Sequence, residues 1–352
     1  MSYSPISDRR PVPGFFADPA DLELSGFERH RRSVRRESEP PAVKHLAGLQ
    51  PTEVSMGKAT FSMPASGWLT SPAGFIAPGA LAFLADAPLS VAIESVLPPG
   101  KTSTTSELSF NFVAPAFSGP GHLVARASVI DVGSRLGFSE AVLTDQHGRL
   151  VAHATSRCVI LDAPELDSRG QRPVDPEWTD TSRPDPWTEE PTGTVDLEID
   201  RRSGLDALRM FVSGELERPP IGNVFGTRPT QVSEGEIIWT AAASPWWSSP
   251  APFVYGGALS VLAEVAHNTA FWTLIPAGSM YANLDLKVQF VRPVFADGSE
   301  LTARGFVTHR GRSIMIAGVE VVNAEGKTVL HGTGSAAVLP EGLALLLAQR
   351  PT

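Results

Sequence analysis

Two acidic residues, Asp86 and Glu264, lie within long apolar stretches of this 352-residue sequence. The first stretch is FIAPGALAFLADAPLSVAIESVL, residues 75–97, and the second is FVYGGALSVLAEVAHNTAFWTLI, residues 253–275. Each acid follows a glycine near an expected helix start by seven residues. Because an unpartnered buried carboxylate is energetically costly, acids at matching positions of two apolar helices indicate a site. Burial also raises the pKa of a carboxylate, which makes it a better general base. The alternative is a structural role, in which each acid accepts hydrogen bonds from loop amides across a domain seam.

The two stretches belong to an internal repeat with an offset of 178 residues. Residues 46–161 align without a gap with residues 224–339, and roughly 36 of the 116 positions are identical. Two copies of this length indicate two fused domains rather than a solenoid, and such units are expected to pack as a pseudo-symmetric pair. Many of the identities are residues typical of turns, namely Gly57/Gly235, Pro98/Pro276, Gly100/Gly278, Pro115/Pro293, Gly133/Gly311 and Gly148/Gly326.

Each copy predicts the same order of elements. A short strand leads through a loop with tryptophan and Ser-Pro-Ala into the long apolar helix, and a proline-containing turn with glycine ends that helix. Period-two alternation then predicts an antiparallel sheet of about five strands. A helix that is apolar on nearly every side must be wrapped by that sheet, so the expected fold class is α+β, with two tandem domains as a pseudo-dimer. The expected strands are 57–63 in the first copy and 235–241, 280–291, 300–310, 313–322 and 328–339 in the second.

Changes in composition give the expected domain limits. An arginine- and proline-rich extension comes first, with a helix over residues 22–36, and a linker dense in proline and acids separates the two copies. A short helix over residues 341–349 ends the chain. The expected segments are 1–44 for the extension, 45–161 for the first domain, 162–206 for the linker, 207–340 for the second domain and 341–352 for the tail.

Composition excludes several classes of function. A net charge of −9 and a pI near 5.4 disfavour nucleic acid as a partner. The single cysteine, Cys158, suits a reducing compartment, and neither a secretory signal nor an apolar run long enough to cross a membrane is found. We therefore expect a cytoplasmic protein. Serine-hydrolase, phosphate-loop and histidine-pair zinc motifs are missing as well, so we expect no metal and no cofactor.

Motifs in the second copy carry a resemblance to a known family. They are Tyr255-Gly256-Gly257 at the helix start, Glu264 at the acid position, and VQFVRP at residues 288–293. This combination resembles the hotdog-fold thioesterases of the PaaI and 4-hydroxybenzoyl-CoA thioesterase type, which have His-Gly-Gly at the helix start. The resemblance implies two tandem hotdog domains and hydrolysis of an acyl-CoA at their interface. A helix-start N–H of one domain would polarise the thioester carbonyl, and the acid of the other domain would act as nucleophile or base.

Carried over to this sequence, the resemblance implies one site around Asp86. The Gly256 N–H would be the oxyanion donor, because a helix start offers free N–H groups and the positive end of the helix dipole. Thr105 and Ser90 would hold the attacking water. Pro88 lies two residues beyond the acid and is expected to kink the helix there.

The second site implied by the resemblance is built around Glu264 and Asn283. Its helix begins with Pro78, which has no N–H to donate, so we expect only the Asp86 site to be competent. Further residues implied to contact substrate are Ser249, Tyr255 and Gly257 near the helix start and Arg310 and Arg312 for the CoA phosphates.

Two other functions remain open on the sequence. A hotdog dehydratase is one, although its acid is expected at the position of Leu84 and its upstream histidine is missing. The other is a non-catalytic acyl-CoA-binding or sensor protein in which both sites have lost activity. The partner expected in every case is an acyl-CoA, and two chains are expected to be able to pair as a homodimer.

Overall fold

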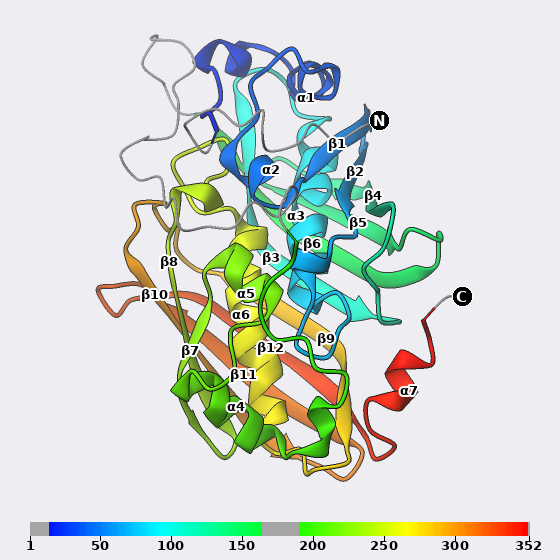
Figure 1. Ribbon diagram of the computed structural model, residues 1–352. Helices are drawn as coiled ribbons and strands as arrows, with labels where there is room; N and C mark the ends of the chain where they lie inside the picture. Colours follow the sequence, from blue (N-terminus) through cyan, green and yellow to red (C-terminus); the bar gives the residue numbers. More distant parts are fainter. Residues whose placement is uncertain (1–13, 164–189, 351–352) are drawn as a thin grey trace.

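The computed structural model describes residues 14–163 and 190–350, and these residues form two domains of the same architecture (Figure 1). In each domain an antiparallel sheet wraps one long helix, and the two long helices lie side by side at the centre of the molecule. The expected α+β fold with two tandem domains in one chain is therefore confirmed.

The first domain contains four short helices, two of them 3₁₀ helices, together with the long helix and six strands. Its elements are η2 (Pro19–Glu23), α1 (Gly26–Arg35), α2 (Ala42–Ala47), β1 (Gln50–Ser55), β2 (Lys58–Pro64), η3 (Gly67–Leu69), α3 (Pro78–Glu94), β3 (Lys101–Phe112), β4 (His122–Val132), β5 (Leu136–Thr144) and β6 (Leu150–Asp162).

The second domain repeats this order and is followed by a short terminal helix, α7 (Ala344–Leu347). Its elements are η5 (Ile199–Arg201), α4 (Gly204–Ser213), α5 (Pro220–Phe225), β7 (Arg228–Ser233), β8 (Glu236–Ala242), η6 (Pro245–Trp247), α6 (Gly256–Trp272), β9 (Met280–Phe290), β10 (Glu300–Arg310), β11 (Ile314–Val322) and β12 (Thr328–Leu339).

One continuous twelve-stranded sheet joins the domains, in the order β1-β2-β4-β5-β6-β3-β9-β12-β11-β10-β8-β7. The junction is the antiparallel pair β3–β9, in which Leu108 lies opposite Val288 and Phe110 lies opposite Leu286. These four side chains are fully buried. The seam between the domains is thus part of the core, as in an obligate dimer interface.

Strands β1 and β7 are the ones that the sequence pattern did not reveal, because each contains a proline near its start, Pro51 or Pro229. Proline cannot donate to a strand ladder and is therefore confined to sheet edges. The two strands are indeed the outer strands of the sheet. The other expected strands are present, with ends shifted by at most one residue.

The structural repeat also extends upstream of the segment found in the sequence. Helices α1 and α4 are equivalent with the same offset of 178, and so are α2 and α5. The Gly26 N–H bonds the Leu97 carbonyl at 3.1 Å, and the Gly204 N–H bonds the Ile275 carbonyl at 2.9 Å. A Cβ on either glycine would lie 1.8 or 1.9 Å from a carbonyl oxygen of the long helix, so only glycine permits this approach. Much of the expected extension and the end of the expected linker thus belong to the domains.

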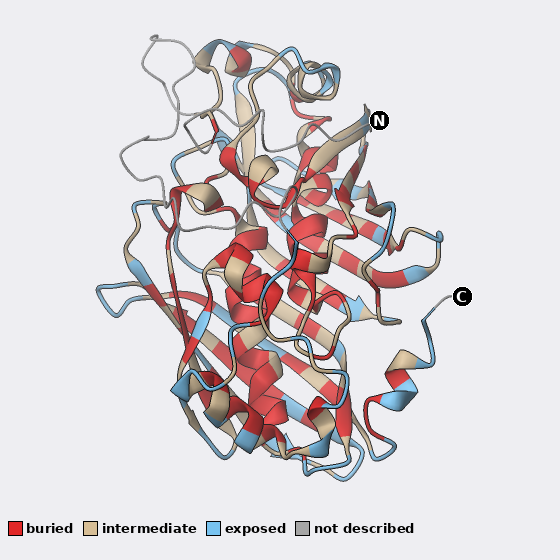
Figure 2. Ribbon diagram, in the orientation of Figure 1, coloured by how far each residue is buried: buried red, intermediate tan, exposed pale blue. Residues whose placement is uncertain are grey.

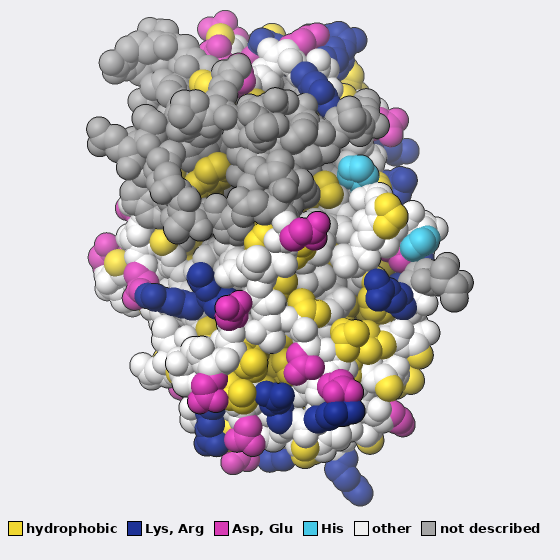
Figure 3. Space-filling model, viewed as in Figure 1, with side chains coloured by type: hydrophobic (Ala, Val, Ile, Leu, Met, Phe, Trp, Pro, Cys, Tyr) yellow, Lys and Arg dark blue, Asp and Glu magenta, His cyan; other side chains and the backbone are white. Residues whose placement is uncertain are grey.

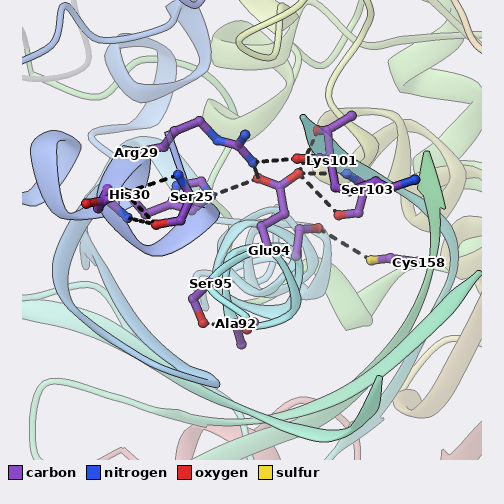
Figure 4. A network of polar contacts seen from close by, with 12 residues as sticks. Ser25, Arg29, His30, Ala92, Glu94, Ser95, Lys101, Ser103 and Cys158 are labelled. Carbon is purple, nitrogen blue, oxygen red and sulfur yellow. Dashed lines mark hydrogen bonds and ion pairs between the residues drawn. The ribbon is translucent and has the colours of Figure 1, made fainter. Parts of the chain in front are cut away.

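The contacts of α1 and α4 differ in chemistry. Helix α1 is tied to the end of α3 by an ionic cluster around Glu94, whose carboxylate lies 2.8 Å from His30 Nε2 and 3.7 Å from an Arg29 nitrogen (Figure 4). At the equivalent place Phe211 of α4 packs on Trp272, with ring centroids 6.5 Å apart. The first domain uses charges where the second uses aromatic rings.

Both long helices are buried over most of their length (Figure 2). Because they are apolar on all sides, they require cover from the sheet and from each other. No helix among residues 14–163 and 190–350 is long and apolar enough to cross a membrane. On the face shown in Figure 3, basic and acidic side chains are intermixed and neither sign dominates.

Candidate active site

Asp86 lies in the third turn of α3 with 2 % of its surface exposed, and hydrogen bonds hold its carboxylate from two sides. Oδ1 accepts a hydrogen bond from Thr105 Oγ1 of β3 at 2.9 Å. Oδ2 accepts a hydrogen bond from the Gly257 N–H at 2.7 Å, and Gly257 belongs to the start of α6 in the other domain. The carboxylate therefore sits on the domain interface, as the sequence predicted.

Further polar groups extend this cluster inside the first domain. Ser90, one turn after Asp86, has its hydroxyl 3.0 Å from Thr105 Oγ1. The Cys158 thiol lies 3.9 Å from the Ser90 hydroxyl. Burial raises the pKa of the Cys158 thiol to about 11, so the thiol stays protonated at neutral pH and is a poor nucleophile.

Gly256 is the first residue of α6 and lies directly beside the carboxylate. A Cβ at this position would be 2.8 Å from Asp86 Oδ2 and 3.3 Å from Phe290 Cζ. Its N–H has no acceptor inside the helix, and none is found among the other described residues. A helix start with a free N–H next to a carboxylate is a suitable place for an oxyanion to form.

Glu264 occupies the equivalent position on α6 and is also 2 % exposed. Its carboxylate accepts a hydrogen bond from Asn283 Nδ2 of β9 at 3.1 Å. Gly79 at the start of α3 lies beside the same carboxylate, because a Cβ on this glycine would be 3.1 Å from Glu264 Oε2. Glu264 and Asn283 thus lie together, as predicted.

The two sites are equivalent residue by residue but differ in chemistry. Asn283 replaces Thr105 and Asn268 replaces Ser90, so amides stand where the first site has hydroxyls. The first residue of α3 is Pro78. Proline has no N–H, so the second site lacks the donor that Gly256 supplies to the first.

The two carboxyl groups also differ in acidity. Burial raises the pKa of Asp86 to about 6, while the hydrogen bonds from Thr105 and Gly257 partly oppose that rise. Burial raises the pKa of Glu264 further, to about 8, while the neighbouring polar groups of Gly79, Asn268 and Asn283 partly oppose that rise. At pH 7 Asp86 is mostly ionised and able to accept a proton, whereas Glu264 is mostly protonated.

Two residues expected to bind substrate make backbone contacts instead. The Tyr255 hydroxyl donates a hydrogen bond to the Phe83 carbonyl at 2.9 Å. The Ser249 hydroxyl lies in the loop before α6, 3.2 Å from both the carbonyl oxygen and the N–H nitrogen of Ala251. Among the described residues, neither side chain forms a hydrogen bond with Asp86.

Arg310 and Arg312 lie at the β10–β11 turn, away from Asp86. Arg310 contacts Glu234 at 3.2 Å and the Leu274 carbonyl at 3.4 Å. Leu274 follows the last residue of α6, so about 25 Å of helix separates it from the start of α6 beside Asp86. Arg312 is exposed. The structure does not bring these two arginines together with the candidate catalytic residues.

Comparison with known proteins gives the class of the protein. A family model described as the thioesterase superfamily matches residues 73–152 and 251–330, one match in each domain. No match is found among curated proteins. Both domains are therefore similar to the thioesterase superfamily, whose class of activity is thioester hydrolysis.

Solved structures show the same double-domain fold at low identity. The TesB protein of Mycobacterium avium subspecies paratuberculosis is 14 % identical, with a TM-score of 0.52 and coverage of 85 % of this chain and 98 % of that chain. A thioesterase candidate from Novosphingobium aromaticivorans is 16 % identical, with a TM-score of 0.51 and coverage of 83 % and 98 %. A hot dog fold protein from Alicyclobacillus acidocaldarius is 15 % identical, with a TM-score of 0.50 and coverage of 85 % and 98 %. The expected pair of hotdog domains is confirmed.

Two contacts of the site were not evident from the sequence. The Gly257 N–H donates a hydrogen bond to Asp86, and the Tyr255 hydroxyl bonds the helix that carries Asp86. Hydroxyl residues of the first copy correspond to asparagines in the second copy, and this exchange of polar residues indicates which side chains accompany the two acids. Within the described residues no group of histidine, cysteine and acidic side chains could hold a metal ion.

Proposed function

We propose that the protein hydrolyses an acyl-CoA to the free acid and CoA at the single site formed by Asp86 and Gly256. Thioester hydrolysis is the activity of the superfamily that both domains resemble, and acyl-CoA is the substrate class that the resemblance to PaaI-type thioesterases implies. CoA enters as part of the substrate, and the proposed reaction uses no cofactor.

The observation that carries the choice of site is the difference between Gly256 and Pro78 at the starts of the two helices. Gly256 has a free N–H beside an ionisable carboxylate, and Pro78 has none. A donor aimed at the developing oxyanion commonly contributes about 10²–10³-fold to acyl-transfer rates. The site with Gly256 is therefore the one that can stabilise the tetrahedral intermediate.

In the proposed reaction the Asp86 carboxylate takes a proton from water, and the water oxygen attacks the thioester carbonyl carbon. The negative charge on the carbonyl oxygen is stabilised by the Gly256 N–H. Collapse of the intermediate breaks the carbon–sulfur bond, and the CoA thiolate receives the proton held by Asp86. Thr105 fixes the carboxylate, and Ser90 fixes Thr105. Direct attack by the carboxylate, followed by hydrolysis of the resulting anhydride, uses the same groups.

The test is release of free thiol from a panel of acyl-CoAs by the wild type, Asp86→Asn and Glu264→Gln. We expect Asp86→Asn to lose at least about 10²-fold in rate, and Glu264→Gln to stay within a few-fold of the wild type. Loss confined to Glu264→Gln would move the active site to the other carboxylate. No thiol release by the wild type, with the CoA ester recovered bound, would replace hydrolysis by binding.

We also propose that the protein acts in the cytoplasm and that two chains associate as a homodimer. The single buried Cys158 supports a reducing compartment. Light scattering of the purified protein tests the homodimer, and fractionation of cells tests the location.

A further inference from the structure

Tyr255 joins the start of α6 to the turn of α3 that carries Asp86. The residue is the N-cap of α6 and is 8 % exposed. Its hydroxyl donates a hydrogen bond to the Phe83 carbonyl at 2.9 Å. One turn of helix runs from Phe83 to Ala87, and Asp86 lies within that turn. The hydroxyl therefore engages the first residue of the turn in which Asp86 lies.

This turn also lacks one of the hydrogen bonds of the helix itself. Pro88 lies inside α3, which continues through it to Glu94. Because proline has no N–H, the Leu84 carbonyl has no donor four residues later. Asp86 lies midway between these two residues, so its position depends on a stretch of helix with a broken ladder.

The Tyr255 ring is fixed on the other side by α6. A Cβ on Gly257 would lie 2.5 Å from Tyr255 Cε1, so the ring rests on the glycine whose N–H bonds Asp86. The same ring packs edge-on against Phe83, with centroids 5.3 Å apart and planes at 88°. One side chain thus contacts both the helix that bears the carboxylate and the residue that donates to it.

The second site has neither feature. The equivalent of Tyr255 is Ala77, which has no hydroxyl, and the equivalent of Pro88 is Ala266, which keeps its N–H. The tyrosine and the proline therefore occur together, and only at the site that also has the free helix-start N–H.

We propose that Tyr255 is a positioning residue for hydrolysis, an inference that rests on the proposed function of the Asp86 site. Its hydroxyl holds the weakened turn of α3 against the start of α6. This keeps Asp86 within reach of the Gly257 N–H and keeps the Gly256 N–H beside the reacting carbonyl. Tyr255 thus acts on the protein rather than on the substrate, in contrast to the role implied by the sequence resemblance.

Tyr255→Phe tests the proposal, because it removes the hydroxyl and keeps the ring. We expect kcat to fall about tenfold, as for the loss of one buried hydrogen bond that positions a catalytic group, with KM changed less than about twofold. The low-pH limb of the rate should also move to higher pH, because the Gly257 hydrogen bond lowers the pKa of Asp86 and would weaken. The matched control is Tyr281→Phe, a buried tyrosine close to Glu264, which should leave all three quantities unchanged.

A second variant tests the role of the weakened turn. Pro88→Ala restores an N–H opposite the Leu84 carbonyl, so the turn should depend less on the tyrosine. In that background Tyr255→Phe should cost about threefold in kcat instead of about tenfold, a coupling that a double-mutant cycle measures.

An unchanged kcat and pH limb in Tyr255→Phe would overturn the positioning role while leaving hydrolysis at Asp86 intact. An equal loss in Tyr281→Phe would also overturn it, since the effect would then reflect a general loosening of the core. Full activity of Asp86→Asn would instead remove the proposed function itself, and with it the reason for a positioning residue.

Discussion

The two domains of this chain share a fold and a carboxylate on the same helical turn, yet their sites differ in what they can do. Asp86 has a pKa of about 6 and lies beside the free N–H of Gly256. Glu264 has a pKa of about 8, accepts a hydrogen bond from the Asn283 amide and faces a helix that begins with Pro78. Each carboxylate nevertheless lies beside the glycine at the start of the opposite helix.

Under the proposed function, the second site keeps the architecture of the first without its oxyanion donor and its ionised base. The close packing of each acid on the opposite helix start stabilises the interface and therefore serves both domains. The oxyanion donor and an ionised base serve only catalysis. The two sites differ by proline in place of glycine at the helix start and by two amides in place of two hydroxyls.

The largest expected effect comes from giving the first site the proline of the second. Gly256→Pro removes the N–H while proline remains compatible with the first position of a helix. We expect kcat/KM for thiol release to fall about 10²–10³-fold. The control is Gly256→Ala, which keeps the N–H but places a Cβ 2.8 Å from Asp86 Oδ2. A loss in the alanine variant as large as in the proline variant would assign the effect to crowding.

The ionic contact of α1 gives the largest expected effect on stability. Burial tends to raise the pKa of Glu94, but His30, Arg29 and the Ser103 N–H together lower it to about 2. A lowered pKa means that this stabilisation is present above about pH 4.5 and is lost as the pH falls towards 2. Glu94→Ala should lower the free energy of unfolding by about 3 kcal/mol at pH 7.

Urea denaturation at pH 7 and pH 3 measures the effect of Glu94→Ala. The difference from the wild type should shrink at pH 3, and the exposed Glu53→Ala should show almost none at either pH. A difference that does not depend on pH would mean that Glu94 contributes by packing, as Trp272 does in the second domain.

A buried histidine distinguishes the cores of the two domains. His267 of α6 is 1 % exposed, and burial lowers its pKa to about 4, whereas its equivalent in α3 is Leu89. A lowered histidine pKa means that the unfolded chain binds more protons, so stability falls between about pH 6.5 and pH 4. The wild type should lose about 2 kcal/mol of its free energy of unfolding between pH 7 and pH 5 because of His267, and we expect His267→Leu to abolish this loss.

Unfolding of the wild type and His267→Leu at the two pH values tests this. The reverse change, Leu89→His, should introduce a similar acid sensitivity into the first domain. If His267→Leu kept the full acid sensitivity of the wild type, other groups would have to account for it.

The smallest expected effect is that Glu264→Gln leaves the pH dependence of kcat/KM unchanged, and this result still discriminates between the two sites. If ionised Asp86 is the base, kcat/KM rises with pH around an apparent pKa of about 6. Glu264→Gln should leave this limb in place. A limb near pH 8 that vanishes in Glu264→Gln would instead identify the second site as the active one.

Much of this structure was predictable, because each hydrophobic pattern and each turn residue that marks an element occurs in both copies of the repeat. The limits of the long strands and the positions of both acids on their helices follow from periodicity and turn residues that occur twice. The sequence did not predict the edge strands β1 and β7, because Pro51 and Pro229 weaken their strand pattern. The match between Gly26 and Gly204 was present in the sequence, yet it stands in a segment whose arginines and prolines indicate a solvated extension.

The sequence alone determined the duplication, the fold class and the two acids, because hydrophobic periodicity and chain punctuation are local properties. Only the tertiary structure decided which N–H bonds Asp86 and where the Tyr255 hydroxyl lies. Both depend on how α3 and α6 meet across the seam. A hydrogen bond needs its donor and acceptor placed to within a few tenths of an ångström, and no spacing along the chain encodes that.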